Sequence, residues 1–583
     1  MQANRLIIAR ALALVLVLAA IGVGGAYAGE SDDDSGRAEA LAQMTAPLPA
    51  TRVLSMAAAL KLHDRTGLEE LLREQQDPLS ANYRGWLTPA EFNQRFGPSQ
   101  AEIDRVAGWL TSEGFIIDSP SPSPRLIRFH GPAGTASIAF GVKFAASSDG
   151  HLFANLNEPR LPEVIAPLVD WIGGLDNLKA KIVLAHLLTA KAAVEIGTSN
   201  IFGPPDIYSF YDETPLLTAT PAPIDGSNTD CVALAEDSDF DHASTDAFNT
   251  QFGLPAFDYS LEADTNFETA YPDSSDPGIP AGEDELESLI DIDYVHALAP
   301  GADIADYVGD NSHATITGLG FLDAALAAIS QNRCGTISIS YDICSGNSSF
   351  FRKIDSFFAQ GAAQGQSIFI AAGDEGAAAF TFEAKQDACV AGKKRGVEGL
   401  ESSPHVTSIG GTMFTPDYDS SGGNIGDVPE SVWNDTSGAS GGGKSNIFGK
   451  PKYQKGLTPR DSSRDVPDIS FGAGLTSPGF YIISLDNELS CNECIAGGTS
   501  IGAPSWAGIS MLIQQELDTR PGLINSALYQ LGPSGAKAGI RDVTSGNNSY
   551  NGVKGYAAVP GYDQASGWGT PDIADFVSAF IAK

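Results

Sequence analysis

The chain has 583 residues, enough for several domains, and its 43% hydrophobic and 18% charged residues are ordinary for a globular protein with a sizeable core. It carries 35 Lys and Arg against 72 Asp and Glu, a formal net charge of −37 at pH 7. Nucleic acids and anionic membranes bind basic patches, so this balance argues against both as partners. The excess carboxylates either solubilise the surface or suit a protein that works in acid, where protonation relieves their repulsion.

The N-terminus has the charged, apolar and cleavable plan of a secretory signal peptide. Two arginines flank the start of an apolar run over Ala11–Ile21, and the small residues of Ala26-Tyr27-Ala28 form a cleavage site. We therefore expect a signal peptide over 1–28, a linker over 29–47 and a secreted, extracellular product. An uncleaved anchor is the alternative, but the run is short for a span, and no later stretch is apolar enough to cross a bilayer.

Six cysteines follow the signal, and an even number in an exported chain favours structural disulfides whose pairing the sequence leaves open. They are Cys231, Cys334, Cys344, Cys389, Cys491 and Cys494. The Cys491-Asn-Glu-Cys494 spacing also fits half a zinc site or a redox pair. However, no second Cys or His pair lies at metal-ligand spacing, and no thioredoxin-like sequence surrounds it. A local or crossed disulfide is the favoured interpretation.

Residues 48–188 are expected to form a compact α+β domain. Thr88 and Glu91 make a capping box at the start of one helix, and an amphipathic helix runs from Ser99 to a stop at Gly114. The stretch Arg125–His130 alternates apolar and polar residues like a strand. No cluster in this domain has the composition of a catalytic site.

A Gly-, Pro-, Ser- and Asn-containing linker is predicted over 189–205, followed by a second domain over 206–583. There, short apolar runs alternate with helical periods, which predicts a doubly wound, mostly parallel α/β sheet. The expected strands are Cys231–Ala235, Ala302–Val308, Thr336–Ser340 and Ser367–Ala372, with helices over Thr317–Gln331 and Lys353–Gln364.

A serine stands on a glycine-rich turn in Gly497-Gly498-Thr499-Ser500-Ile501-Gly502, just before a stretch of helical period. At such a helix N-terminus, backbone N–H groups and the helix dipole favour developing negative charge, so Ser500 is a candidate nucleophile. The alternative is a glycine-rich turn in which Ser500 only caps the helix.

No histidine follows Ser500. The α/β-hydrolases, whose G-x-S-x-G pattern this turn also fits, need one, so that class is excluded. The Asp, His, Ser order of subtilisins survives on order alone, but no histidine is followed by the glycine-containing helix start that subtilisins use. The candidates are His242, His296, His313 and His405, which we interpret as core or surface residues. If Ser500 is activated, we expect a group other than His to do it.

Carboxylates offer that group. A helix that begins near Gly282 and stops at Pro300-Gly301 carries Glu287 and Asp291 four residues apart on one face, where a buried pair would share one proton. A solvated acidic helix face is the alternative. Asp374 follows the buried run 368–372, at the strand edge where open α/β sheets place ligands. An Asx-turn that caps this strand is the alternative.

Together these residues resemble the sedolisin family of serine-carboxyl peptidases, with a kumamolisin-type activation prosegment at the N-terminus. Segments that resemble the family's motifs follow one another in the family's order. They are Leu87–Phe92, Gly150–Asn155, Asp291–Ala302, Ala371–Gly376, Ser403–Thr412, Val432–Asp435, Ser440–Gly443, Val466–Ser470 and Gly498–Pro504.

The resemblance implies a subtilisin-like fold, endopeptidase activity in acid on protein or peptide substrates, and release of the prosegment by self-cleavage between about Leu188 and Pro204. The prosegment would act as intramolecular inhibitor and chaperone, and the enzyme would be a monomer. Among the residues, the resemblance makes Ser500 the nucleophile, Glu287 its general base, Asp291 the partner of Glu287 and Asp374 the stabiliser of the oxyanion.

The resemblance also implies one structural Ca²⁺ near the C-terminus. Its ligands would come from Asp542, Val543, Val559, Gly561 and Asp563. Two carboxylates and backbone carbonyls on irregular turns are the hard oxygen ligands that Ca²⁺ takes. Val559 stands where the family has a Gly, which is tolerable if only its carbonyl binds.

Two positions near the expected site depart from the family's pattern. Tyr341 stands where the family has a Trp, and Asp342-Ile-Cys-Ser replaces the Gly-rich segment that follows it in the family. Glu236 matches a carboxylate that extends the proton network in some members, and the Tyr341 replacement leaves that extension open here. Two rival functions also remain: a subtilisin-like Ser/His/Asp peptidase, and a catalytically inactive, calcium-stabilised extracellular binding protein.

Overall fold

A computed structural model describes most of the chain from residue 41 onward. The described residues are 41–42, 44–178, 181–183, 186–189, 201–260, 265–272, 275–279, 284–311, 319–344, 348–383, 388–420, 422–485 and 493–583. The expected signal peptide over 1–28, the linker up to residue 40, His313 and Cys491 lie outside them. In the described part of the chain, no helix has the length and apolar character needed to cross a membrane.

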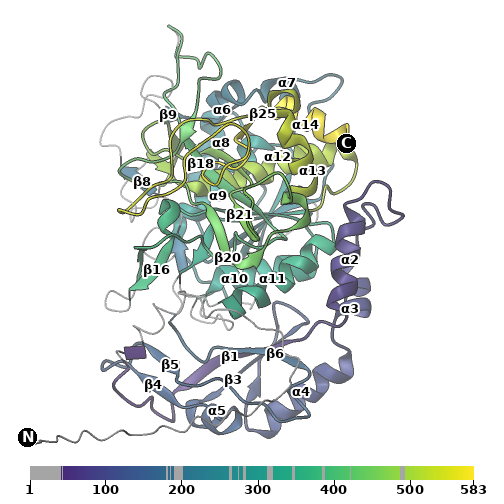
Figure 1. The fold of residues 1–583 in the computed structure, drawn as a ribbon, viewed down its shortest axis with the longest axis vertical. Coiled ribbons are helices and arrows are strands. Elements are labelled where there is room, and N and C mark those ends of the chain that lie inside the picture. The colour runs from purple at the N-terminus through teal and green to yellow at the C-terminus, as the bar shows by residue number, and fades with distance from the viewer. Residues whose placement is uncertain are drawn as a thin grey trace, which may run out of the picture. The chain divides into compact units, whose positions relative to one another are not determined.

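The N-terminal domain is an antiparallel sheet with helices on one side (Figure 1). Its strand order is β2-β3-β1-β6, formed by Ile116–Ile117, Leu126–Pro132, Val53–Leu60 and Val169–Gly173. Helices α4 (Gln100–Ser112) and α5 (Ala133–Ala139) bury their apolar side chains against this sheet. The α+β prediction is thus confirmed for this domain.

Helix α3 (Pro89–Phe96) begins at the predicted capping box. The Thr88 hydroxyl accepts a hydrogen bond from the backbone N–H of Glu91 at 3.2 Å, and the Glu91 carboxylate accepts one from the Thr88 N–H at 2.8 Å. Ser99 and Glu102 repeat the arrangement at the start of α4. Each box satisfies backbone donors that a helix start otherwise leaves without partners.

The C-terminal domain is built on a mostly parallel sheet whose strand order is β11-β12-β10-β13-β15-β18-β19, with β22 beside β18. Its strands are Phe267–Ala270, Asp303–Val308, Cys231–Glu236, Thr336–Ile339, Ser367–Ala371, Thr407–Met413, Ser431–Val432 and Ile469–Gly472. Only β19 runs antiparallel to its neighbour.

Side chains on alternate faces of this sheet enter two different cores. Val232 and Leu234 of β10 pack in the core of α9 (Asp284–Leu298) and α12 (Gly502–Leu517). Ala233 and Ala235 pack in the core of α10 (Gly320–Gln331) and α11 (Ser348–Ala363). Helices therefore cover both faces, and the predicted doubly wound, subtilisin-like architecture is confirmed. Helix α11 begins at Ser348, before the expected Lys353.

The remaining elements surround these two sheets. The helices are α2 (Arg65–Gln75), α6 (Pro204–Phe210), α7 (Thr214–Leu217), α8 (His242–Phe252), α13 (Asn525–Leu531) and α14 (Ile573–Ile581). The strands are β4 (Phe144–Ala146), β5 (Phe153–Asn155), β7 (Lys181–Val183), β8 (His186–Thr189), β9 (Ile201–Phe202), β14 (Tyr341–Ile343), β16 (Phe380–Glu383), β17 (Ala388–Ala391), β20 (Gly443–Gly449), β21 (Ser463–Val466), β23 (Gly479–Ile482), β24 (Cys494–Gly497), β25 (Ile540–Arg541) and β26 (Thr570–Pro571).

The C-terminal domain begins earlier than the predicted boundary at 206. Strand β9 pairs in parallel with β23, and α6 begins at Pro204. Thr189, the first residue of the expected linker over 189–205, belongs to β8, which pairs with β24, and residues 190–200 lie outside the described residues. Composition suggested a linker here, but backbone pairing with distant strands decides the boundary.

Disulfides join elements that are far apart in sequence. Cys231 at the start of β10 is bonded to Cys334, and Cys344 is bonded to Cys389. Cys494 is disulfide-bonded as well. The prediction of structural disulfides is confirmed at these positions.

An indole from the N-terminal domain fills a slot in the C-terminal domain. Trp86 Nε1 donates to the Arg520 carbonyl at 3.1 Å. A Cβ at either Gly365 or Gly522 would lie 2.4 Å from the ring of Trp86, so both positions need to lack a side chain. The next residue, Leu87, donates its N–H to the Ala363 carbonyl at the end of α11 at 3.0 Å. The slot thus attaches the N-terminal domain to α11 and its surroundings.

Replacing Trp86 with Ala should weaken this attachment. Emptying the slot is expected to cost about 2 kcal/mol, less than for a fully buried Trp because part of the ring is exposed. The melting temperature of the full-length chain should fall by several degrees. Leu79→Ala provides the control, since that side chain is 95% exposed and its truncation should leave the melting temperature unchanged. Equal shifts in the two variants would contradict the assignment of Trp86 as an anchor.

Candidate active site

Helix α9 carries two of the predicted site residues into the interior. From Glu285 to Leu298 every residue of the helix is buried, and Glu287 and Asp291 are fully so. The helix packs against α12, β10 and α8, which explains why its apolar residues are not confined to one face. A solvated acidic face, the alternative from sequence, is therefore excluded.

Glu287 faces Ser500. Burial raises the pKa of Glu287 well above its usual range, and the nearby Ser500 hydroxyl opposes this shift by favouring the ionised form. Neither Glu287 oxygen makes a hydrogen bond of good geometry with a described group, so the Ser500 contact is a loose one. Such looseness is common in sites that tighten only around substrate.

Asp291 and Glu236 continue the row of carboxyl groups away from Ser500. Asp291 Oδ1 accepts a hydrogen bond from the Ser340 hydroxyl at 2.6 Å. Glu236, at the end of β10, accepts one from the Tyr341 hydroxyl at 2.9 Å. Burial raises the pKa of both acids, and each is also close enough to the other for a hydrogen bond between them. Tyr341 thus holds Glu236 beside Asp291 although it replaces a Trp.

Asp374 reaches the site from the sheet. It follows the end of β15, and its Oδ1 accepts hydrogen bonds from the Thr499 N–H at 2.9 Å and the Thr499 hydroxyl at 2.7 Å. The Thr499 hydroxyl in turn accepts from the Gly373 N–H at 3.1 Å. These bonds tie Asp374 to the residue before Ser500, so its role is more than capping its own strand. Asp374 is also near enough for its charge to raise the pKa of Glu287.

Ser500 lies on a short 3₁₀ turn, Thr499–Ile501, directly before α12. Gly498 precedes the turn with φ of +125°, a backbone conformation that a residue with a side chain rarely adopts. Ser500 therefore lies in the interior together with Glu287, Asp291 and Asp374.

Sequence reasoning missed Ser340 and Thr499, which hold Asp291 and Asp374. Ser340 ends a buried strand at the same edge of the sheet as Asp374, and Thr499 is adjacent to Ser500. Both residues could have been suspected from their positions next to site residues. However, hydroxyl groups in turns and at strand ends often hydrogen-bond to the nearby backbone, so position alone does not indicate a role in the site.

The described histidines have partners elsewhere. His296 Nε2 contacts the Pro255 carbonyl at 2.8 Å, and His242 stacks on Tyr259 with ring centroids 3.9 Å apart. His405 Nδ1 lies 2.8 Å from Asp355, whose charge raises the pKa of His405 against the opposing effect of burial.

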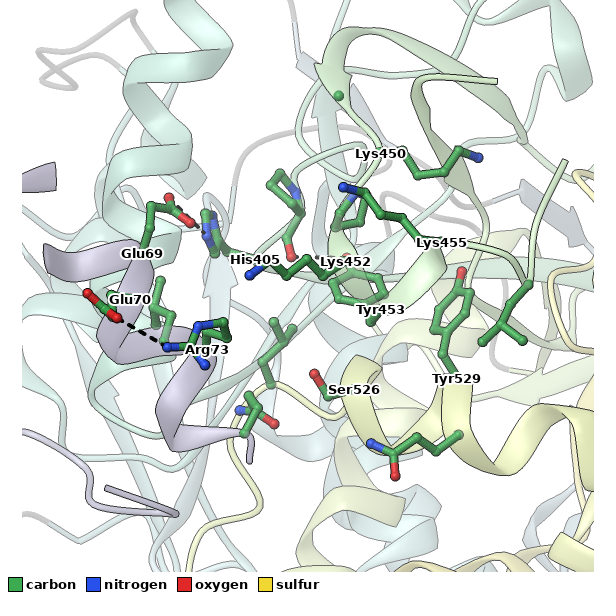
Figure 2. Close-up of a pocket in the computed structure, with 18 of the residues that line it drawn as sticks. Glu69, Glu70, Arg73, His405, Lys450, Lys452, Tyr453, Lys455, Ser526 and Tyr529 are labelled. Atoms are coloured by element: carbon green, nitrogen blue, oxygen red, sulfur yellow. Dashed lines mark hydrogen bonds and ion pairs between the residues drawn. The ribbon is translucent and has the colours of Figure 1, made fainter. Parts of the chain in front are cut away.

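His405 lies in a cavity of about 860 Å³ between α2 and the 449–457 loop (Figure 2). Its Nε2 atom is 3.7 Å from Glu69 of α2. The ion pair ties His405 to the boundary between the domains. None of the three histidines has the serine contact that a subtilisin-like triad requires.

The segment between the domains runs past the site. Strand β7 pairs antiparallel with β14, and β8 pairs antiparallel with β24. Strand β14 directly follows Ser340, and β24 ends three residues before Ser500. Extended backbone from the N-terminal side therefore lies on both strands that lead to the site, in the way that a peptide adds to exposed sheet edges.

The turns proposed to bind calcium come together near the C-terminus. The Gly561 N–H donates to Asp542 Oδ2 at 2.8 Å, and the Val559 N–H donates to Asp563 Oδ2 at 2.9 Å. No group of three or more His, Cys, Asp or Glu side chains suited to a metal ion occurs among the described residues. A site here would combine two carboxylates with carbonyls of these turns, an all-oxygen set that fits Ca²⁺.

Comparison with known proteins decides the family. Residues 42–178 match the model of the pro-kumamolisin activation domain. Kumamolisin from Bacillus sp. (strain MN-32) is 30% identical over 551 residues, which cover 90% of this chain and 91% of that protein. This chain belongs to the sedolisin family of serine-carboxyl peptidases. It is therefore a hydrolase, and the resemblance inferred from its motifs is confirmed.

Other members of the sedolisin family support the assignment. A solved structure of Pseudomonas sedolisin, a serine-carboxyl proteinase, matches with a TM-score of 0.54 and 27% identity over 66% of this chain and 99% of that one. Xanthomonalisin from Xanthomonas sp. (strain T-22) is 27% identical over 90% of this chain, which spans 65% of that protein. The N-terminal domain is the activation prosegment, and the C-terminal domain is the peptidase domain.

The buried carboxyl groups predict how stability changes with pH. Because burial raises the pKa of Glu236, Glu287 and Asp291, the folded protein favours their protonated forms. Their contribution is complete below the unfolded pKa of about 4 and is lost as pH rises toward the folded values. The free energy of unfolding of a full-length Ser500→Ala chain should therefore fall between about pH 5 and pH 7.

In the Ser500→Ala chain, Glu236→Gln should make the free energy of unfolding fall less steeply with pH. The slope should decrease by up to about 1.4 kcal/mol per pH unit, because an amide cannot ionise. Urea denaturation at several pH values measures this. Glu70→Gln is the matched control, since its parent carboxylate is 65% exposed, and it should keep the parent slope. Stability that rises from acid to neutral pH would contradict the predicted sign.

Proposed function

We propose that this sedolisin-family chain is a secreted zymogen of an acid-active endopeptidase. Ser500 is its nucleophile, Glu287 the general base, Asp291 the support of Glu287, and Asp374 the stabiliser of the oxyanion. The observation that carries the proposal is the pairing of Ser500 with a buried carboxyl group, together with the hydrogen bond from Thr499 of the same turn to Asp374.

Ser500 Oγ attacks the carbonyl carbon of the peptide while Glu287 takes the hydroxyl proton. A C–O bond forms, and the electron pair of the carbonyl moves to its oxygen, where a protonated Asp374 donates a hydrogen bond. Glu287 then gives its proton to the leaving nitrogen, the C–N bond breaks and an acyl-enzyme remains. Water repeats the sequence with Glu287 again as base, which releases the acid product and restores Ser500.

Asp291 and Glu236 allow Glu287 to act as a base. An isolated buried Glu287 would hold its proton too strongly to act, because burial disfavours its charge. A proton kept on Asp291 instead removes like-charge repulsion and leaves Glu287 ionised. Activity then requires an ionised Glu287 and a protonated Asp374 together, and this combination favours acid over neutral pH.

The zymogen proposal is supported by the course of the chain beside the site. The prosegment is continuous with β7 and β8, which cover the strands where a peptide substrate would pair. A chain folded in this way blocks its own cleft until the segment is cut. Our expected cleavage interval, about Leu188 to Pro204, begins within β8 and ends at α6.

Ser500→Ala and Glu287→Gln should both abolish prosegment release and hydrolysis of a casein-type substrate. Wild type should show a bell-shaped pH profile in acid. Loss of the Asp374 donor proton should slow hydrolysis about a hundredfold, because this is the usual effect of losing one oxyanion donor. Purified proteins followed by gel and by release of soluble peptides across pH provide the measurement.

Ser505→Ala is the matched control for this experiment. Its hydroxyl donates to the Ile501 carbonyl at 2.7 Å inside α12, so its removal should affect stability and leave the pH profile intact. A Ser500→Ala protein that still processes itself, or wild-type activity that is flat from acid to neutral pH, would refute the mechanism. His405→Gln should retain activity, which separates this mechanism from a subtilisin-like one.

We also propose one structural Ca²⁺, held by the carboxylates of Asp542 and Asp563 and by the carbonyls of Val543, Val559 and Gly561. The ion would neutralise both acids and hold the turns together. Asp563 is only 4% exposed, and burial raises its pKa, so a cation at this position would offset the cost of its charge.

Chelation should lower the melting temperature of the Ser500→Ala chain. A ligand at 100 times its Kd adds about 2.7 kcal/mol to stability, which corresponds to several degrees. Asp563→Asn should remove this dependence on Ca²⁺. The matched control is Asp518→Asn, at an exposed carboxylate after α12, and it should respond to the chelator like its parent. An unchanged melting temperature in the parent would contradict the site.

A further inference from the structure

Strand β14 connects the proposed active site to the prosegment. One end of the strand lies at the site, and its edge pairs with a strand of the prosegment side of the chain. Ser340, immediately before the strand, bonds Asp291. Along the strand, Tyr341 pairs with Val183 of β7 and Asp342 pairs with Ile182. Once the prosegment leaves, this edge is open to a substrate backbone. The position of β14 then determines how well a substrate is held.

Two acids with no role in catalysis meet behind this strand. Asp342 and Glu401 are both fully buried. Asp342 Oδ1 accepts hydrogen bonds from the Ile343 N–H at 2.6 Å and, more weakly, from the Leu400 N–H at 3.5 Å. Asp342 therefore bridges β14 and the loop that contains Glu401.

The backbone N–H groups of Glu401 and Ser402 also lie near the carboxyl groups of Asp342 and Glu401, respectively. Within the described part of the chain, Asp342 Oδ2 and both oxygens of Glu401 make no well-formed hydrogen bond to another group. Neither acid forms an ion pair with a described Lys or Arg. Two buried carboxylates in contact repel strongly, whereas one shared proton gives a short, charge-assisted hydrogen bond.

The surrounding charges favour a single shared proton. Burial raises the pKa of Asp342 to about 7 and that of Glu401 well above its usual range, and Asp342 and Glu398 raise the pKa of Glu401 further. Backbone N–H groups of Ile343 and Leu400 favour charge on Asp342, so Glu401 carries the proton.

We propose that Asp342 and Glu401 are positioning residues that share one proton and thereby fix the substrate-pairing strand β14 to the 398–402 loop. The inference rests on the proposed function, because it assigns β14 to the substrate. When the shared proton is lost, two like charges face each other in the interior and β14 shifts or loosens. Acid dependence then enters through KM, separately from the effect of the catalytic carboxylates on kcat.

Steady-state kinetics of the self-activated enzyme on a peptide substrate provide the first test. Wild-type KM should rise about tenfold between pH 5 and pH 7, which corresponds to about one pKa unit of coupling. In Glu401→Gln, the amide donates to an ionised Asp342 and cannot ionise, so KM should stay flat while the pH profile of kcat is unchanged. A wild-type KM that is flat, or a Glu401→Gln KM that follows the wild-type rise, overturns the proposal.

Glu213→Gln is the matched control. Glu213 is also fully buried with a pKa raised by burial, but it precedes α7, away from β14. The same substitution there should leave the rise in KM unchanged. If Glu213→Gln also flattens KM, the effect belongs to buried acids in general and the proposal fails. Asp342→Asn replaces Glu401→Gln if the latter does not fold, because its amide can donate to Glu401.

Hydrogen exchange provides a second test that needs no activity. In the full-length Ser500→Ala chain, protection of the 341–343 backbone, corrected for intrinsic pH dependence, should fall about tenfold between pH 5 and pH 7. Adding Glu401→Gln should keep it constant. Protection that is independent of pH in the parent overturns the positioning role. Inactivity of the wild-type enzyme with the expected exchange would contradict the proposed function alone.

Discussion

The peptidase domain depends on one constraint, the burial of acids that can ionise. Helix α9 packs against α12, β10, α6, α8 and β23, and it carries Glu287 and Asp291 into a region that excludes water. Two charges there would cost far more than the few kcal/mol by which proteins are stable. The fold therefore persists only if these groups are mostly protonated or share protons. The free energy of unfolding should therefore be larger in acid than at neutral pH.

The same constraint explains how other parts of the chain are arranged. Glu236 has a Tyr341 hydroxyl and a neighbouring carboxyl group in place of a cation, and Asp342 and Glu401 face each other. With 35 Lys and Arg against 72 Asp and Glu, the chain has too few cations to pair every acid. Hydroxyl donors and shared protons replace salt bridges, which makes these contacts sensitive to pH.

The sequence predicted features that depend on local spacing and missed those that depend on distant pairing. Four-residue spacing placed Glu287 and Asp291 on one face, and the strand run before Gly373 placed Asp374 at the sheet edge. Thr88 and Glu91 showed a helix start because a capping box is contained in four residues. By contrast, the linker boundary and the Asp342–Glu401 contact depend on segments that only the folded sheet brings together.

Stability and catalysis make opposite demands on Glu287, and the row of carboxyl groups reconciles them. Burial favours the protonated acid, but a general base must be ionised. If one charge is distributed over Glu287, Asp291 and Glu236, the interior holds a single charge while Glu287 is ionised for part of the time. Tyr341 and Ser340 stabilise that charge through hydroxyl hydrogen bonds, without the permanent cation that would keep it on one residue. A mobile proton among acids of similar strength can therefore replace the histidine of other serine peptidases.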